Sequence, residues 1–465
     1  MESDIGIINL LHIYKNNLEV MIMEKKKLGL VSLMIFSMFF GAGNLIFPPL
    51  LGQLSGTRIF VSMGGFFISA VGLPILAIAI VAKVGGLQVL ASRVHPKFAV
   101  AFTVLIYLSI GPFLGIPRAA SLAFEMGISP FISDITGQTR LPLFIYTLVF
   151  FGIAYWLCMT PSKLVDRFGK VLTPILLVLI SSIFIYSLFK PIGNLVAPLG
   201  DYAKSPFLQG FLDGYLTMDA IAALNFGIVI SIALNGMGII EEKKLVSSTV
   251  KAGIMAGALL MIVYVMLAYL GAVSQSRFGA TENGAQTLTN VVFFLFGPMG
   301  SVLLGGIFSL ACLTTSVGLL TSCSQYFAAL KPAISYRTWI TILSLSSMLF
   351  ANIGLTQILK ISVPVLTAIY PMAIVLMVLA LFDKYYQGNS QVYLFAMTLT
   401  SFVSISEALG QFGLKLKFLE LIPFYSVGLG WIIPSIIGAL VGFLYGNKGK
   451  WDVDKEESEE RKIIV

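Results

Sequence analysis

The sequence predicts an all-α integral membrane protein with about 12 transmembrane helices, of which the first and sixth are broken. Two observations predict this class. Of the 465 residues, 57% are hydrophobic and only 11% are charged, whereas an average soluble protein carries about 25% charged residues. The apolar residues also fall into runs of about 20, the length of helix that crosses a bilayer. This composition excludes a soluble enzyme, a nucleic-acid-binding protein and a disordered chain.

Each predicted span is an apolar run of about 20 residues bounded by polar or charged positions. The spans are expected near residues 28–52, 59–82, 98–122, 141–159, 168–189, 211–237, 252–274, 297–329, 338–353, 361–382, 392–409 and 421–445. Two halves of five spans, about 28–189 and 211–382, would have opposite orientations because each contains an odd number of spans. The last two spans would then be peripheral.

The distribution of Lys and Arg predicts the orientation. With the N-terminus in the cytoplasm, the cytoplasmic segments contain most of the basic residues, including those at 25–27, 163–170 and 243–251. Because basic residues are enriched in cytoplasmic loops, both termini are expected there. The net charge of +8 therefore indicates orientation and not a nucleic-acid partner.

These features divide the chain into four parts. We expect an N-terminal cytoplasmic segment over residues 1–27, a transmembrane core over 28–382, two peripheral transmembrane helices over 383–445 and a cytoplasmic tail over 446–465. Cys158, Cys312 and Cys323 all lie within apolar runs, which is typical of buried thiols and not of a disulfide framework.

A break is predicted in the first span, at residues 40–49 (FGAGNLIFPP). Two glycines flank an alanine, Asn44 follows, and two prolines close the motif. Gly and Pro lower helix stability by about 1 and 3 kcal/mol, and irregular backbone in a membrane occurs only inside protein or beside a cavity. The freed N–H and C=O groups suit a carboxylate and a small cation. A glycine-rich packing face with a proline kink is the alternative.

A second break is predicted in the sixth span, at residues 214–220 (GYLTMDA). An ionisable residue such as Asp219 is costly inside hydrocarbon, so it indicates a functional site. The alternative is that Asp219 lies in a water-filled vestibule or pairs with a buried donor. Broken helices at corresponding positions of two halves indicate a transporter binding site. Arg118 and Glu125 are expected to pair at the outer face.

Hydroxyl groups cluster in the eighth span at residues 311–316 (ACLTTS). Hydroxyl oxygens are hard donors that suit Na⁺. Taken alone, such a run is more typical of helix packing, because Ser and Thr hydroxyls also bond to their own helix.

Together these motifs resemble those of the BrnQ-type branched-chain amino acid:cation symporters. The resemblance rests on residues 41–49 (GAGNLIFPP), 214–220, the Thr314-Thr315 run and 111–118 (GPFLGIPR), and it extends over the chain after residue 23. It implies a LeuT-like fold with a five-plus-five inverted repeat.

The resemblance also implies a substrate site at the two breaks. The backbone N–H groups of Ala42 and Gly43 would hold the substrate carboxylate, and Asn44 and Thr217 would contribute to a first sodium site. Asp219 departs from the usual glycine-rich and serine-rich sixth break, and a sodium ligand in the seventh span has no evident match.

A second sodium site is implied between the first and eighth spans. Its ligands would be the carbonyl oxygens of Ser37 and Phe40 with Ala311 and the hydroxyls of Thr314 and Thr315. The LeuT-like fold usually has an Ala-x-x-Thr-Ser pattern here, and Thr315 in place of Ser keeps the hydroxyl.

The predicted function is sodium-coupled import of Leu, Ile and Val across a bacterial cytoplasmic membrane by alternating access, with no catalytic residues. A proton-coupled carrier that uses Asp219 is the first alternative, and a multi-span membrane enzyme is a remote one, because it would need a His, Asp or Glu constellation that the sequence lacks. The expected partners are the small-molecule substrates Leu, Ile and Val and the membrane lipid, without nucleic acid or an obligatory protein partner.

Overall fold

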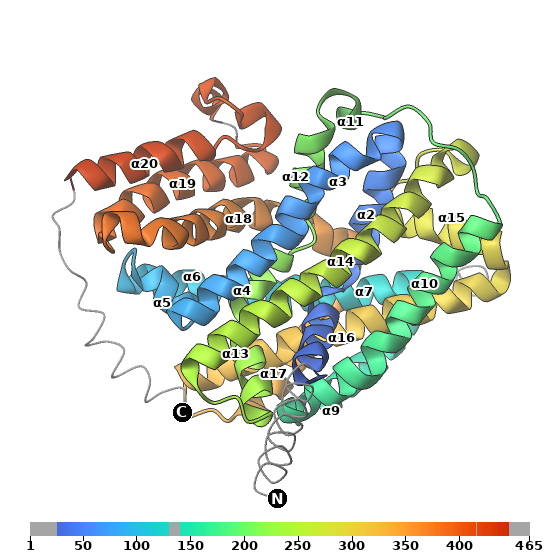
Figure 1. The fold of residues 1–465 in the computed structure, drawn as a ribbon, viewed down its shortest axis with the longest axis horizontal. Coiled ribbons are helices and arrows are strands. Elements are labelled where there is room, and N and C mark those ends of the chain that lie inside the picture. Colours follow the sequence, from blue (N-terminus) through green and yellow to red (C-terminus); the bar gives the residue numbers. More distant parts are fainter. Residues whose placement is uncertain (1–25, 130–139, 415, 446–465) are drawn as a thin grey trace, which may run out of the picture.

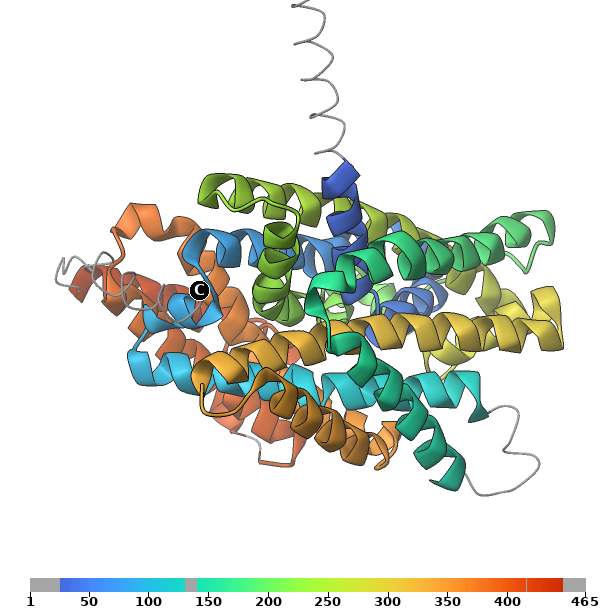
Figure 2. The same ribbon diagram turned by 90° about the horizontal axis from the view of Figure 1, so that it is seen from below.

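The computed structural model describes residues 26–129, 140–414 and 416–445. All regular secondary structure among these residues is helical. Long helices run across the molecule in several directions (Figure 1), and a view turned by 90° shows them stacked in layers (Figure 2). The predicted N-terminal segment up to residue 25 and the C-terminal tail lie outside the described residues.

The first span is broken where the sequence predicts it. A helix over residues 26–39 ends at Phe40, and α2 (Ala42–Ser55) begins after Gly41. Pro48 and Pro49 lie inside α2 and do not end it, since a buried membrane helix tolerates proline when neighbouring groups compensate for the lost hydrogen bonds. The irregular backbone is therefore confined to Phe40 and Gly41.

The sixth span is broken as well. α12 (Pro206–Tyr215) and α13 (Asp219–Gly236) are separated by residues 216–218. Met218 has φ of 71°, which places a non-glycine residue in the left-handed region, an uncommon conformation that occurs at turns and functional sites. This turn lets α13 begin with Asp219 in its first position.

A kink divides the third span. α6 (Pro96–Leu108) passes through a π-helical turn, η3 (Ser109–Phe113), into α7 (Gly115–Gly127). Gly111 has non-helical backbone angles and Pro112 removes an N–H donor, and both are recognised causes of helix kinks. The kink turns the start of α7 towards the interior.

The remaining helices connect and surround these broken spans. Their bounds are η1 (Gly56–Arg58), α3 (Ile59–Phe67), η2 (Ile68–Gly72), α4 (Leu73–Val84), α5 (Leu87–Ser92), α9 (Arg140–Cys158), η4 (Pro161–Lys163), η5 (Val165–Leu172), α10 (Thr173–Phe189), α11 (Asp201–Lys204), α14 (Glu242–Phe278), α15 (Gly284–Phe296), α16 (Pro298–Leu330), α17 (Tyr336–Ala351), α18 (Leu355–Tyr386), α19 (Ser390–Gln411), η6 (Lys417–Leu421), η7 (Tyr425–Val427) and α20 (Ile432–Tyr445).

Within the described residues, nine helical runs are long and apolar enough to cross a membrane. The count of twelve stays a prediction. The difference is clearest at the end, where residues 421–445 were expected to form one span. There, 3₁₀ turns η6 and η7 precede α20, which has only 14 residues, fewer than the roughly 20 of a full span.

The packing of the broken helices interleaves the two halves of the core. α2 packs against α14, the long helix that follows α13. In the same way α13 packs against α4, the last part of the helical run α3–η2–α4 that follows α2. Each broken helix therefore contacts the second span of the opposite half, as expected when two similar halves pack in inverted orientations. α19 and α20 pack on each other at one edge, beside α18 (Figure 1).

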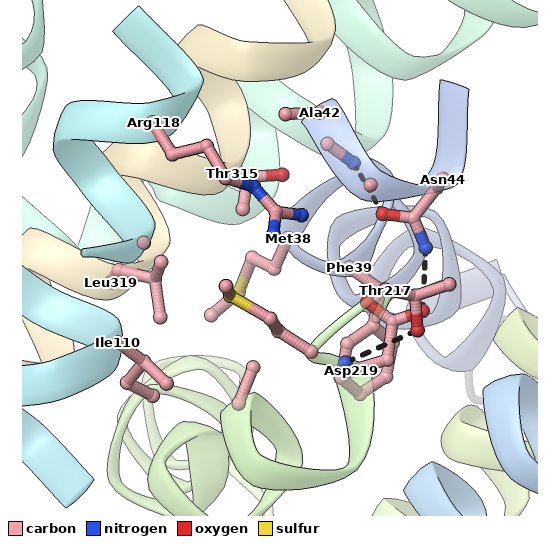
Figure 3. A pocket seen from close by; sticks show the side chains of 15 residues that line it. Met38, Phe39, Ala42, Asn44, Ile110, Arg118, Thr217, Asp219, Thr315 and Leu319 are labelled. Atoms are coloured by element: carbon pink, nitrogen blue, oxygen red, sulfur yellow. Dashed lines mark hydrogen bonds between the residues drawn. The ribbon is translucent and has the colours of Figure 1, made fainter. Parts of the chain in front are cut away.

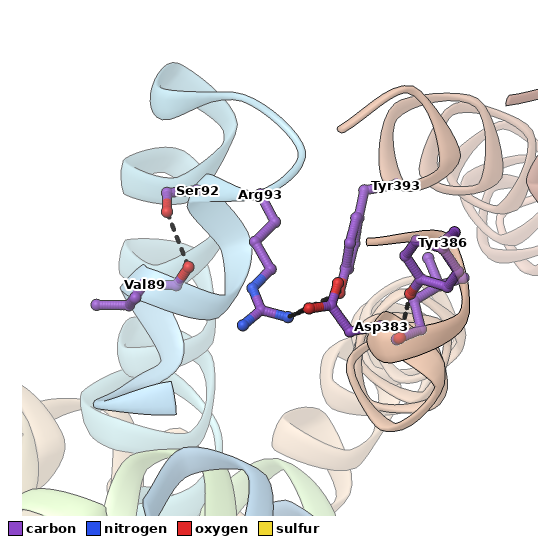
Figure 4. A network of polar contacts seen from close by, with 7 residues as sticks. Val89, Ser92, Arg93, Asp383, Tyr386 and Tyr393 are labelled. Carbon is purple, nitrogen blue, oxygen red and sulfur yellow. Dashed lines mark hydrogen bonds and ion pairs between the residues drawn. The ribbon is translucent and has the colours of Figure 1, made fainter. Parts of the chain in front are cut away.

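A polar network joins that edge to the rest of the molecule. Arg93, just after α5, lies 3.2 Å from the carboxylate of Asp383 on α18 and donates a 2.9 Å hydrogen bond to the Tyr393 hydroxyl on α19 (Figure 4). Tyr393 in turn donates to Asp383 at 2.9 Å. The side chains of the ion pair are about one-quarter exposed, so the pair is partly shielded from water and salt.

Candidate functional site

The two helix breaks meet around a small cavity. Its wall includes Gly41, Ala42, Gly43 and Asn44 from the first break, and residues 217–219 from the second. A Cβ atom built at Gly43 would lie 2.8 Å from the Cα of Thr217, so only glycine permits this approach. The predicted breaks are thus in direct contact, and Figure 3 shows their side chains facing one space.

Asp219, Asn44 and Tyr264 form a buried triangle of hydrogen bonds. The Asn44 amide donates to Asp219 Oδ2 at 2.5 Å, and the Tyr264 hydroxyl donates to the same oxygen at 3.0 Å. Asn44 also bonds to the Tyr264 hydroxyl, and its Oδ1 accepts from the Gly41 N–H at 3.0 Å. The triangle therefore fixes the first break, α13 and α14 relative to one another.

Thr217 lies two residues before the start of α13. Its hydroxyl lies 3.4 Å from the backbone N–H of Asp219, and it donates to the carbonyl of Gly214 at 2.8 Å. Thr217 and Asp219 are both buried. All five residues predicted for the substrate site, Ala42, Gly43, Asn44, Thr217 and Asp219, line the same cavity.

The predicted second ion site forms a cluster of oxygen atoms beside the first break. The Thr314 hydroxyl lies 2.9 Å from the Ser37 carbonyl oxygen and 3.0 Å from that of Ala311, and the Thr315 hydroxyl lies 3.4 Å from Ser37 O. Four of the five expected ligands are therefore brought together. Phe40 is at the break itself, and its N–H donates to Phe36 O at 2.8 Å.

The donor set of this cluster suits a hard monovalent cation. The cluster consists of the carbonyl oxygens of Ser37 and Ala311 and the hydroxyl oxygens of Thr314 and Thr315. Carbonyl and hydroxyl oxygens are the ligands that such cations prefer. Thr315 Oγ1 also lies so close to Gly41 that a Cβ atom there would be 2.6 Å away. The first break is thus in close contact with α16.

Arg118 occupies a different place from the one expected. Its side chain is 4% exposed and points from α7 into the cavity (Figure 3). It donates to the carbonyl of Leu216 in the second break at 3.1 Å and lies over the Phe47 ring at 5.9 Å. The expected pair with Glu125 is wrong because the kink at η3 turns the start of α7 inward, and Glu125 lies two helical turns away.

The rest of the cavity wall is apolar and comes from several elements. Met38, Phe39, Ile110 and Leu319 contribute side chains (Figure 3). The cavity volume is about 30 Å³, far below the roughly 300–1,000 Å³ of a ligand pocket. A whole amino acid would therefore enter only after the surrounding helices move apart.

Two residues of the site were missed at the sequence level. Tyr264 lies in the middle of the long apolar α14, where a tyrosine resembles any packing residue. Arg118 follows Gly115 and Pro117, which look like the end of a span. The signal that could have singled out Arg118 was its charge, since ionisable residues within a span indicate function.

Residues 24–448 match the protein family described as branched-chain amino acid transport protein. The chain belongs to this family. It is thus a membrane transport protein and not an enzyme, which removes the multi-span enzyme from the alternatives.

Individual relatives agree with the family match. The chain is 44% identical to the branched-chain amino acid permease BraB of Bacillus subtilis over 421 residues, which cover 89% of this chain and 94% of BraB. It is 41% identical to the branched-chain amino acid transport system 2 carrier protein of Pseudomonas aeruginosa over 412 residues, covering 88% and 93% of the two chains.

Solved structures share the fold. Mhp1, a nucleobase-cation-symport-1 family transporter solved in a closed conformation with bromovinylhydantoin bound, has a TM-score of 0.56 and 13% identity, and the match covers 90% of this chain and 91% of Mhp1. The inward-facing conformation of Mhp1 gives a TM-score of 0.54. This likeness confirms the predicted LeuT-like fold.

Proposed function

We propose that this protein imports Leu, Ile and Val across the bacterial cytoplasmic membrane, coupled to the entry of Na⁺. Its relatives are named as branched-chain amino acid permeases and carriers, which supports the substrate class. The observation that carries the coupling is the placement of the Thr314 hydroxyl 2.9 Å from the Ser37 carbonyl oxygen beside the first break.

The coupling ion would bind between the first helix and α16. Ser37 O, Ala311 O and the hydroxyls of Thr314 and Thr315 are the proposed ligands, with the Phe40 carbonyl completing the set. Because these ligands belong to two elements, an ion shared between them would favour the arrangement in which the break lies against α16.

The substrate would bind where the two breaks face each other. The first N–H groups of a helix have no acceptor within the helix, so those of Ala42 and Gly43 at the start of α2 suit a carboxylate. The ammonium group would lie near Thr217 and Asp219, and Asn44 would join the substrate site to the first sodium site. An aliphatic side chain would occupy the apolar wall.

Such a wall discriminates weakly among aliphatic side chains. One methylene changes binding by only about 1–3 kcal/mol, so Leu, Ile and Val are expected to share this carrier. Alternating access would open the small cavity to each side of the membrane in turn, as the halves that meet at Gly43 and Thr217 move relative to one another.

Proton coupling through Asp219 is the second candidate. The observation in its favour is that this carboxyl group is 2% exposed and accepts hydrogen bonds from both Asn44 and Tyr264. Intramembrane carboxyl groups in transporters also act as proton relays.

The deciding experiment is uptake of radiolabelled leucine into proteoliposomes, with Na⁺ and H⁺ gradients imposed separately. An inward Na⁺ gradient alone should drive accumulation above equilibrium, and a pH gradient alone should not. Accumulation driven by the pH gradient without Na⁺ would establish the proton-coupled alternative instead. Unlabelled Ile and Val should compete with leucine.

The orientation is proposed from the distribution of basic residues, with both termini in the cytoplasm. Single cysteines introduced at Gly200 and at Lys244, on opposite predicted sides, test it. In intact cells, a membrane-impermeant thiol reagent should label the first and not the second; the reverse pattern would invert the topology.

A further inference from the structure

Arg118 is a buried positive charge that makes no direct ion pair within the part of the chain that the structure describes; Asp219 is an acidic group of the same cavity. Arginine is almost never fully buried unless it is paired, because removing an unpaired charge from water is costly. None of the ion pairs found among the described residues includes Arg118. Its one hydrogen bond there is to the neutral carbonyl of Leu216.

The carboxyl group in the cavity wall, that of Asp219, already has hydrogen-bond donors within the protein. Asn44 and Tyr264 both donate to its Oδ2 atom, and its backbone N–H faces the Thr217 hydroxyl. The two side chains therefore have different direct partners: Asp219 is held by Asn44 and Tyr264, and Arg118 extends from α7 into the cavity (Figure 3) and bonds to Leu216 of the second break.

The guanidinium group lies close to the start of α2. A Cβ atom at Gly43 would be 2.9 Å from Arg118 Nη2, so this nitrogen and the N–H groups at the start of α2 border the same space. Guanidinium has five N–H donors in a planar fork that matches a carboxylate. One N–H of this same Nη2 donates to Leu216 O at 3.1 Å, which leaves the other four N–H groups of the guanidinium without a hydrogen-bond partner among the described residues.

We propose that Arg118 binds the carboxylate of the transported amino acid, together with the N–H groups at the start of α2. This inference rests on the proposed function and adds a specificity-determining residue to it. A substrate with a carboxylate balances the buried charge, and one without a carboxylate leaves it unbalanced. Arg118 thereby makes the site selective for amino acids over amines of the same shape.

The test compares two ligands that differ only at the carboxylate. L-leucine and L-leucinamide have the same side chain and ammonium group, and leucinamide has a neutral amide instead of the carboxylate. Their affinities are measured by ligand-induced thermal stabilisation of the purified protein in detergent, for the wild type and for Arg118→Met and Arg118→Lys. Arg58→Met is the matched control, since Arg58 also donates to a backbone carbonyl, that of Ala203, but is exposed.

Wild-type protein should bind leucine much more tightly than leucinamide. Arg118→Met should weaken leucine binding by about 10- to 100-fold, as expected for loss of a charge-assisted pair, with leucinamide affinity nearly unchanged, so that selectivity for the carboxylate disappears. Arg118→Lys keeps the positive charge but not the planar guanidinium, so its loss of leucine affinity should be intermediate. If Arg118→Met cannot be purified as a folded protein, the comparison of the two ligands is made with Arg118→Lys instead. Arg58→Met should behave as the wild type.

Three results would overturn the inference. An equal loss of affinity for both ligands would mean that Arg118 only braces the Leu216 turn, and unchanged leucine binding in Arg118→Met would mean that it has no role in binding. Recovery of leucine affinity in the double variant Arg118→Met/Asp219→Asn would make Arg118 the counter-ion of Asp219. Failure of the wild type to bind any branched-chain amino acid would contradict the proposed function itself.

Discussion

Gly43 and Thr217 bring two broken helices from opposite halves of the molecule into backbone contact. A Cβ atom at Gly43 would lie 2.8 Å from the Thr217 Cα and 2.9 Å from its carbonyl oxygen. Because both neighbouring atoms belong to the backbone, a side chain at residue 43 could be accommodated only by moving one break away from the other.

Replacement of Gly43 by alanine should therefore abolish leucine uptake in proteoliposomes, because the added methyl group separates the breaks at the substrate site. Gly306→Ala is the matched control. Gly306 lies within α16, and no neighbouring side chain or other helix lies within 4 Å of a Cβ atom there, so this variant should take up leucine normally. Normal uptake by Gly43→Ala would show that this contact is not required during transport.

Loss of the Thr314 hydroxyl should weaken the response to sodium. In Thr314→Ala and Thr315→Ala, we expect the Na⁺ concentration for half-maximal leucine uptake to rise about tenfold or more, since a ligand to a charge contributes about 1.5–3 kcal/mol. Thr314→Ser should restore the wild-type value. Thr321→Ala is the control on the same helix, as Thr321 contacts Cys158 instead. If Na⁺ activation is unchanged in both alanine variants, the proposed ion site is wrong.

Tyr264 should contribute to substrate affinity without touching the apolar wall. Tyr264→Phe removes one donor from Asp219 and breaks the bond to Asn44, so the apparent affinity for leucine should fall about 3- to 30-fold, in line with one buried hydrogen bond. Tyr269→Phe tests a tyrosine of the same helix that packs edge-on against Phe184. Comparable losses in both variants would point to a general effect on α14.

Asp219→Asn separates substrate binding from ion coupling. The amide keeps the size of the side chain and removes its charge, so we expect a higher KM for leucine, with uptake still driven by an inward Na⁺ gradient. The measurement is accumulation in proteoliposomes under each gradient. If the wild type responds to a pH gradient and the variant loses that response, Asp219 carries the proton.

The Arg93–Asp383 pair should stabilise the attachment of α18 and α19. Asp383→Asn keeps the shape and loses the charge, and a partly shielded pair contributes on the order of 1 kcal/mol. We expect a small decrease in the melting temperature of the purified protein, with leucine uptake retained. The reciprocal exchange Arg93→Asp/Asp383→Arg should recover part of the loss, and an unchanged melting temperature in Asp383→Asn would show that the pair is not stabilising.

The sequence predicted the two breaks because their cause is local. Two glycines in three residues lower helix stability whatever surrounds them, and the helix is interrupted at Gly41, although Gly43 and Asn44 already lie in the first turn of α2. The second break was located through Asp219, because an ionisable residue in an apolar run is evident from the sequence alone. The fold class followed equally directly from apolar runs of constant length. The placement of Thr314 against Ser37 came from resemblance to a family, since no local property of a Thr-Thr pair selects one neighbouring helix.

The residues that were missed depend on tertiary structure. Arg118 enters the cavity because η3 redirects α7, and the direction of a kink depends on packing as well as on Gly111 and Pro112. Tyr264 acquires its role only because α2 packs against α14. The short α20 likewise was not evident, since the apolar run at 421–445 continues through residues that form 3₁₀ turns.

The π-turn at Ser109–Phe113 sets the rotational register of α7. Such a turn corresponds to one residue inserted into a regular helix, and one residue rotates everything that follows by about 100°. Shortening η3 by a single residue would swing the guanidinium of Arg118 off the cavity and present a different face of α7 to the breaks. The chemistry of the cavity therefore depends on the number of residues in η3, which precedes α7, as well as on the identity of the residues that line the cavity.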